Sequence, residues 1–117
     1  MPVKRIEAVF YRTTTGVDVV LEWLRSLPKE ERKAVGDDLR RIEFRWPIGM
    51  PLSRPLGDGL HELRSRLPTD RIARLIFFIS AGEELVVLHG FIKKTQTTPL
   101  RELALARKRR REYEEQR

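Results

Sequence analysis

Apolar and polar residues recur along the chain in seven periodic segments, separated by short stretches rich in glycine, proline or polar residues. A period of about two residues predicts a strand, and a period near 3.6 predicts a helix with one apolar face. We therefore expect four strands and three helices in the order β-α-α-β-β-β-α. The strands are expected at 3–11, 60–67, 72–79 and 85–93, and the helices at 17–27, from 28 to about 46, and from 99 onward.

The stretch 47–59 is expected to be a loop, because it contains three prolines and three glycines. The last three strands follow one another through short connections at 68–70 and 80–84, and short connections imply antiparallel neighbours. The pattern predicts an α+β fold, with a mostly antiparallel four-stranded sheet packed against helices. A length of 117 residues suits a single domain over residues 1–117.

Symmetric turns between the last three strands would set their register. Arg64 would then stand opposite Arg74, Arg74 opposite Gly90, and Ile72 opposite Ile92. Since side chains alternate between the two faces of a strand, one face should carry Arg64, Arg66, Arg74 and Lys94. The other face should carry Lys93 and His89.

Two arginines directly opposite each other repel, so this arrangement needs a reason. One reason is an anion held between them, since planar guanidinium groups suit phosphate and Gly90 would leave room for it. Arg74→Ala would then leave the fold intact and relieve the repulsion. The alternative is that Glu62 and Asp70 neutralise these cations on an ordinary solvated face. His89, a lone histidine on an apolar face, is expected to be a satisfied core residue rather than a catalytic one.

Charge and composition narrow the class of partner. The 24 Lys and Arg against 17 Asp and Glu give a formal net charge of +7, which favours an acidic partner such as nucleic acid. The absence of cysteine excludes disulfides and thiolate chemistry. No apolar run approaches a membrane span, and the first ten residues lack a signal-peptide core. We expect a cytoplasmic protein without a membrane partner.

Three sequence runs also carry a family resemblance: LHELR at 60–64, ARLIFF at 73–78 and LHGFIKKTQTTP at 88–99. In order and spacing they resemble the phage-derived, HigB-like branch of the RelE/ParE toxin superfamily. The resemblance implies a RelE-like fold and a toxin of a type II toxin–antitoxin system. That toxin would cut mRNA on the ribosome without a metal or other cofactor, and a HigA-like helix-turn-helix antitoxin would inhibit it.

The resemblance also assigns roles by position. Arg64, Arg74, Lys93 and Lys94 would be catalytic, and His61, Thr95 and Gln96 would bind RNA. Arg66, which the strand register places on the face of Arg64, is a further RNA-binding candidate. Cations suffice for such chemistry, because the 2′-hydroxyl of RNA attacks its own phosphate and the protein stabilises the added charge. A lysine whose pKa is lowered by neighbouring cations can also accept the proton. Two non-enzymatic alternatives remain: a ParE-like gyrase inhibitor and a basic RNA-binding module.

Overall fold

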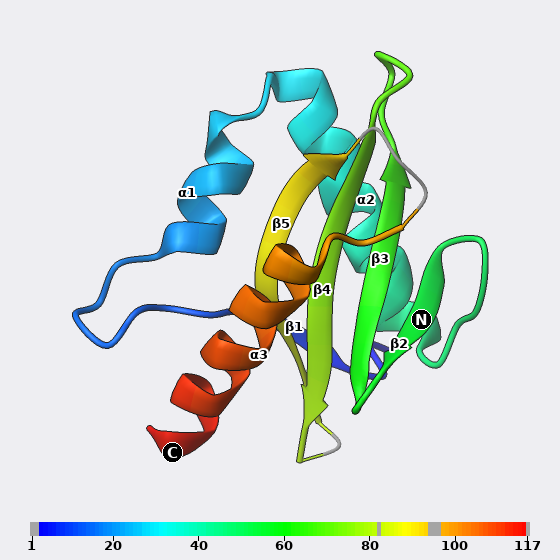
Figure 1. Cartoon of the computed structure of the whole chain (residues 1–117). Coiled ribbons are helices and arrows are strands. Elements are labelled where there is room, and N and C mark those ends of the chain that lie inside the picture. Colours follow the sequence, from blue (N-terminus) through cyan, green and yellow to red (C-terminus); the bar gives the residue numbers. More distant parts are fainter. Residues whose placement is uncertain (1–2, 82, 94–96, 117) are drawn as a thin grey trace.

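The computed structural model describes residues 3–81, 83–93 and 97–116, without the side chain of Lys93. In these residues it has a five-stranded mixed sheet and three helices (Figure 1), so the predicted α+β class is confirmed. The elements are β1 (Glu7–Phe10), α1 (Val19–Ser26), α2 (Lys29–Arg45), β2 (Ser53–Gly57), β3 (Leu60–Arg66), β4 (Ile72–Ser80), β5 (Glu84–Lys93) and α3 (Leu100–Glu115).

The strands lie side by side in the order β1-β5-β4-β3-β2. The three neighbouring pairs formed by β2 to β5 are antiparallel, as the short connections predict. β1 is the exception, because it runs parallel to β5, with Glu7 beside Glu84 and Phe10 beside Val87. A parallel neighbour needs a long crossover, and here the crossover contains α1, α2 and the other three strands.

The predicted loop at 47–59 is wrong in its second half, where Ser53–Gly57 forms β2. Proline and glycine hide this strand from a sequence pattern, yet both are tolerated at the edge of a sheet. Pro55 pairs with His61, and a bulge follows before Gly57 pairs with Leu60. The sheet therefore has five strands instead of the predicted four.

Helices cover the two faces of the sheet unequally (Figure 1). On one face, here called the α2 face, α1 and α2 pack through Trp23 and through Trp46, whose ring lies 5.6 Å from that of Phe77. On the other, the α3 face, Tyr113 packs edge-on against Phe78 at 5.8 Å. Before α3 begins, the chain at 97–99 crosses in front of β4 and β3. None of the helices in the described ranges is both long and apolar enough to cross a membrane.

Candidate functional site

The predicted arginine pair is present. Arg64 on β3 stands directly opposite Arg74 on β4, and Arg66 stands opposite Ile72. All four positions lie on the α3 face, because directly opposed residues of an antiparallel pair project to the same side. The symmetric-turn prediction therefore holds along the whole β3–β4 pair.

The predicted register between β4 and β5 holds only near their turn. Phe77 pairs with Val87 as expected, but a bulge follows and Ile76 pairs with His89. Beyond the bulge, Arg74 stands opposite Phe91 rather than Gly90. An extra residue in one strand exchanges the faces of all later positions. The expectation that Ile72 faces Ile92 is also wrong, because its partner is Lys93.

Gly90 consequently lies on the α2 face, opposite Leu75, and offers no room for a ligand beside Arg74. A Cβ atom at Gly90 would lie only 2.4 Å from Cζ3 of Trp23 on α1. The missing side chain is thus needed for the close packing of a tryptophan against the sheet. The predicted ligand space is wrong for this physical reason.

Arg74 is a buried residue with a carboxylate partner. Its side chain is 2% exposed, and Nη1 donates to Oε1 of Glu62, which is 0% exposed, at 3.0 Å. Arg54 of β2 donates to the same oxygen at 3.1 Å, and the Thr98 hydroxyl donates to Oε2 at 2.6 Å. Glu62 therefore neutralises Arg74 as the alternative interpretation proposed, but in the interior rather than on a solvated face. The same carboxylate also holds Thr98, and with it the end of the connector to α3.

Arg64 and Arg66 differ from Arg74. Arg64 is partly exposed and Arg66 is exposed, and neither forms an ion pair with any residue that the structure describes. The Nε of Arg64 is buried without a hydrogen-bond partner among those residues. A buried donor without an acceptor is unfavourable in the free protein. These two arginines are consequently the cations on this face that are available to an anion.

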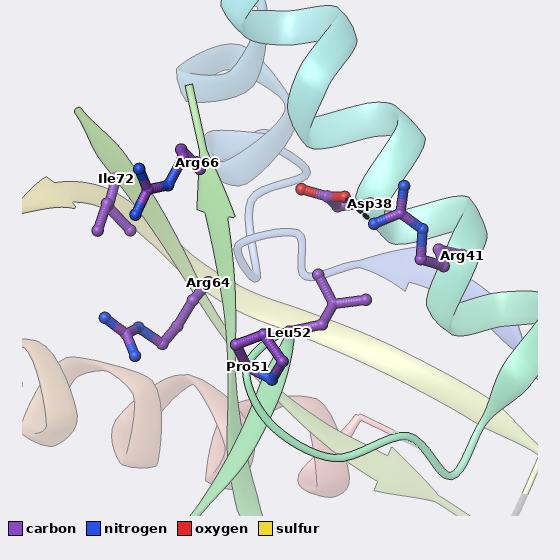
Figure 2. Close-up of a pocket in the computed structure, with 7 residues that line it drawn as sticks. All are labelled: Asp38, Arg41, Pro51, Leu52, Arg64, Arg66 and Ile72. Atoms are coloured by element: carbon purple, nitrogen blue, oxygen red, sulfur yellow. Dashed lines mark hydrogen bonds and ion pairs between the residues drawn. The ribbon is translucent and has the colours of Figure 1, made fainter. Parts of the chain in front are cut away.

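A cleft of about 470 Å³ adjoins the two arginines. Figure 2 shows Arg64 and Arg66 on one side of β3, and Asp38 and Arg41 of α2 on the other. Leu52 lies at the base of the cleft in this view. Sequence periodicity could not reveal Asp38 or Arg41 as site residues, because charged residues on a helix are normally solvated.

Part of the predicted site lies outside the described residues. Lys94, Thr95 and Gln96 belong to this part, as does the side chain of Lys93. The backbone of Lys93 is described, and it stands in the cross-strand row of Ile72 and Arg66. The sequence prediction had placed Lys93 away from these arginines, and the bulge in β5 reverses that placement.

His61 is not brought together with the arginines. It lies on the α2 face, stacked on Phe77 with ring centroids 5.3 Å apart and edge-on to Trp46 at 5.2 Å. Burial lowers the pKa of His61 below its ordinary value. Its contacts are those of a packed, uncharged ring at the margin of the core.

His89 is a satisfied core residue, as predicted, although it lies on the α3 face. Its ring stacks on Phe91 at 5.3 Å, and its Nε2 lies 3.1 Å from Oε2 of Glu102 on α3. Arg109 can only donate, so its contact of 3.4 Å with Nδ1 makes that nitrogen the acceptor and leaves the proton on Nε2. Burial lowers the pKa of His89, opposed by Glu102 and assisted by Arg109.

The lowered histidine pKa values predict an acid-sensitive fold. Below the ordinary histidine pKa of about 6.5, the unfolded chain binds protons that the folded chain does not bind. The contribution of the two histidines to the free energy of unfolding should therefore be fully present above that pH. It should decrease as the pH drops toward their pKa values in the folded state. His61 and His89 are the only histidines in the chain. The melting temperature, measured between about pH 5 and 8, should thus depend less on pH in a His61→Gln/His89→Gln double variant. An unchanged slope would refute this assignment.

In the described ranges, no three His, Asp or Glu side chains converge into a group that could hold a metal ion. The site is instead an open, cationic sheet face beside a cleft, in an α+β fold broadly consistent with that of RelE-like proteins, from which it differs in strand number and order.

Comparison with known protein families agrees with the RelE-like fold. The model of the phage-derived Gp49-like protein family (DUF891) matches residues 22–111, and the chain belongs to that family, which is of the toxin-like RelE/HigB type. The match covers α2, the whole β2–β5 sheet region and most of α3. The search of curated proteins found no match to this sequence.

Proposed function

We propose that this protein is the toxin of a type II toxin–antitoxin system and that it cuts mRNA on the ribosome. The proposal rests chiefly on Arg64 and Arg66, two cations on the α3 face of the sheet that have no ion-pair partner in the described residues. Membership of the Gp49-like family supports the toxin role. The partners implied are a HigA-like helix-turn-helix antitoxin, the ribosome and mRNA.

In the proposed reaction the 2′-hydroxyl of the RNA attacks the adjacent phosphorus, and the bond to the 5′-oxygen of the next nucleotide breaks. Arg64 would bind the phosphate and stabilise the additional negative charge of the transition state. Lys93 or Lys94 would accept the hydroxyl proton. Arg74, whose charge Glu62 neutralises, would hold this carboxylate and, through it, the connector at Thr98.

One observation favours a non-enzymatic alternative. Because Glu62 neutralises Arg74, the face holds fewer uncompensated cations than the sequence suggests. A ParE-like gyrase inhibitor or a simple RNA-binding module needs only a basic surface and no positioned base. The two classes differ in what happens to mRNA inside the cell.

Mapping mRNA 5′ ends after induction distinguishes the two. We expect new ends in phase with codons in translated messages within minutes of wild-type induction, and none for Arg64→Ala. Because Arg64 has no ion pair in the described structure, a thermal melt should show that this variant remains folded. Growth arrest with intact mRNA and stalled replication would contradict the nuclease and support gyrase inhibition.

A further inference from the structure

The edge of the sheet is open beside the candidate site. β2 covers β3 only as far as Arg64, whose backbone N–H donates to the Leu52 carbonyl at 2.8 Å. Beyond that point no strand in the described residues flanks Ser65 and Arg66 on this side. The cleft of about 470 Å³ lies here and continues around the edge of β3 from the α3 face to α2 (Figure 2).

The charges along this cleft are unbalanced. Three guanidinium groups, those of Arg41, Arg64 and Arg66, line it together with one carboxylate, that of Asp38. Asp38 is already engaged, because Arg41 donates to it at 3.0 Å and the Ser65 hydroxyl donates at 2.6 Å. The cleft therefore has an excess of positive charge, and its lining includes Arg64, whose Nε has no hydrogen-bond partner among the described residues.

Apolar side chains complete the lining. Leu52 and Ile72 add apolar surface to the lining, Leu52 on the side of β3 toward α2 and Ile72 beside Arg66 on the other side. Cations combined with apolar surface suit a chain that has an anionic backbone and flat, weakly polar bases, which is the pattern of single-stranded nucleic-acid sites. The volume is within the range of sites that hold a small ligand, so one nucleotide can be accommodated.

We propose that this cleft binds single-stranded RNA next to the cleaved phosphodiester and leads it over the edge of β3. Arg66 and Arg41 contact successive phosphates, and a base lies against Leu52 on the side of β3 toward α2. This inference rests on the proposed function, because Arg64 belongs to both sites and makes the cleft continuous with the cleaved phosphate. RNA is favoured over an acidic peptide for the same reason.

A charge-matched pair of variants tests this path. Arg41→Gln removes a cation that lines the cleft, whereas Arg40→Gln removes an exposed neighbour on the same helix that does not. Binding of a short single-stranded oligoribonucleotide, 2′-O-methylated to prevent cleavage, is measured by fluorescence anisotropy across a salt series. Loss of one phosphate contact should lower the slope of log K against log salt by about 0.7 for Arg41→Gln, and leave it unchanged for Arg40→Gln.

A ribosome assay provides the second measurement. Arg41→Gln should raise the KM for cleavage of a translated message and leave kcat near the wild-type value, because Arg41 contacts RNA away from the reacting atoms. Arg40→Gln should change neither value. Equal salt slopes for the two variants, or a fall in kcat with KM unchanged, would overturn the cleft proposal.

Two further outcomes separate the proposals from each other. If oligonucleotide binding depends on Arg41 and Arg66 but no message is cut, the nuclease function fails and the RNA-binding cleft stands. If Arg41→Gln weakens binding of an acidic peptide and leaves RNA binding unchanged, the cleft belongs to a protein partner and the RNA proposal is overturned.

Discussion

Replacing Arg74 by alanine is expected to lower the free energy of unfolding by at most about 3–5 kcal/mol, the usual effect of removing one partner of a buried ion pair. The loss is limited because Arg54 still pairs with Glu62. In a domain of this size the melting temperature should fall on the order of 10–30 °C. The reason is the burial of both members, with Glu62 at 0% and Arg74 at 2% exposure. This reverses the expectation from sequence, which treated Arg74 as a surface cation whose loss would leave the fold intact.

A double-mutant cycle separates this structural role from a role in toxicity. Glu62→Leu and Arg74→Met should each be strongly destabilising, whereas the double variant should recover most of the loss, because no uncompensated charge then stays buried. Arg54, with 28% of its side chain exposed, can turn to water when Glu62 is absent. A stable double variant that still arrests growth would assign Arg74 to the scaffold. Single variants that melt like the wild type would contradict the buried pair.

Exchanging the lysines for arginine should have the largest effect on rate. Arginine keeps the positive charge but cannot act as a base. If a lysine accepts the 2′-hydroxyl proton, its replacement should slow single-turnover cleavage about 10²–10⁴-fold. The sequence favoured Lys94 for this role, because a symmetric register put it on the face of Arg64. The bulge in β5 brings the strand position of Lys93 into the row of Arg66, so the larger loss is now expected for Lys93→Arg.

The required measurement is the rate of cleavage at saturating ribosome concentration. The salt dependence of RNA binding serves as the control, because it shows whether the positive charge has been preserved. If Lys93→Arg and Lys94→Arg both react within a few-fold of the wild type, neither lysine is the base. The cationic face would then act by electrostatic stabilisation alone.

Sequence alone predicted the β3–β4 register correctly because the short turn at 68–70 leaves the two strands little freedom. It failed beyond Val87, because a single extra residue in β5 does not disturb an apolar pattern in which nearly every position is hydrophobic. That one residue decided the placement of Gly90, His89 and Lys93. A bulge in a fully buried strand is therefore invisible to alternation.

The burial of charged residues was equally hard to foresee. Glu62 was a candidate partner of the arginines by sequence, but its depth depends on β2 and on the connector at Thr98, which arrive from distant parts of the chain. β2 itself was missed because Pro55 and Gly57 are typical of loops. The cleft was missed with it. β2 begins only at Ser53, opposite Leu63, and this leaves Ser65 and Arg66 at an open edge.

The parallel pairing of β1 with β5 has a consequence for synthesis of the protein. Glu7 can pair with its neighbour Glu84 only after β5 has left the ribosomal exit tunnel. Contacts between residues so far apart in sequence slow folding, because a long loop must close before they form. The sheet is therefore completed only after β5 has been synthesised, and β1 lacks its parallel neighbour until then.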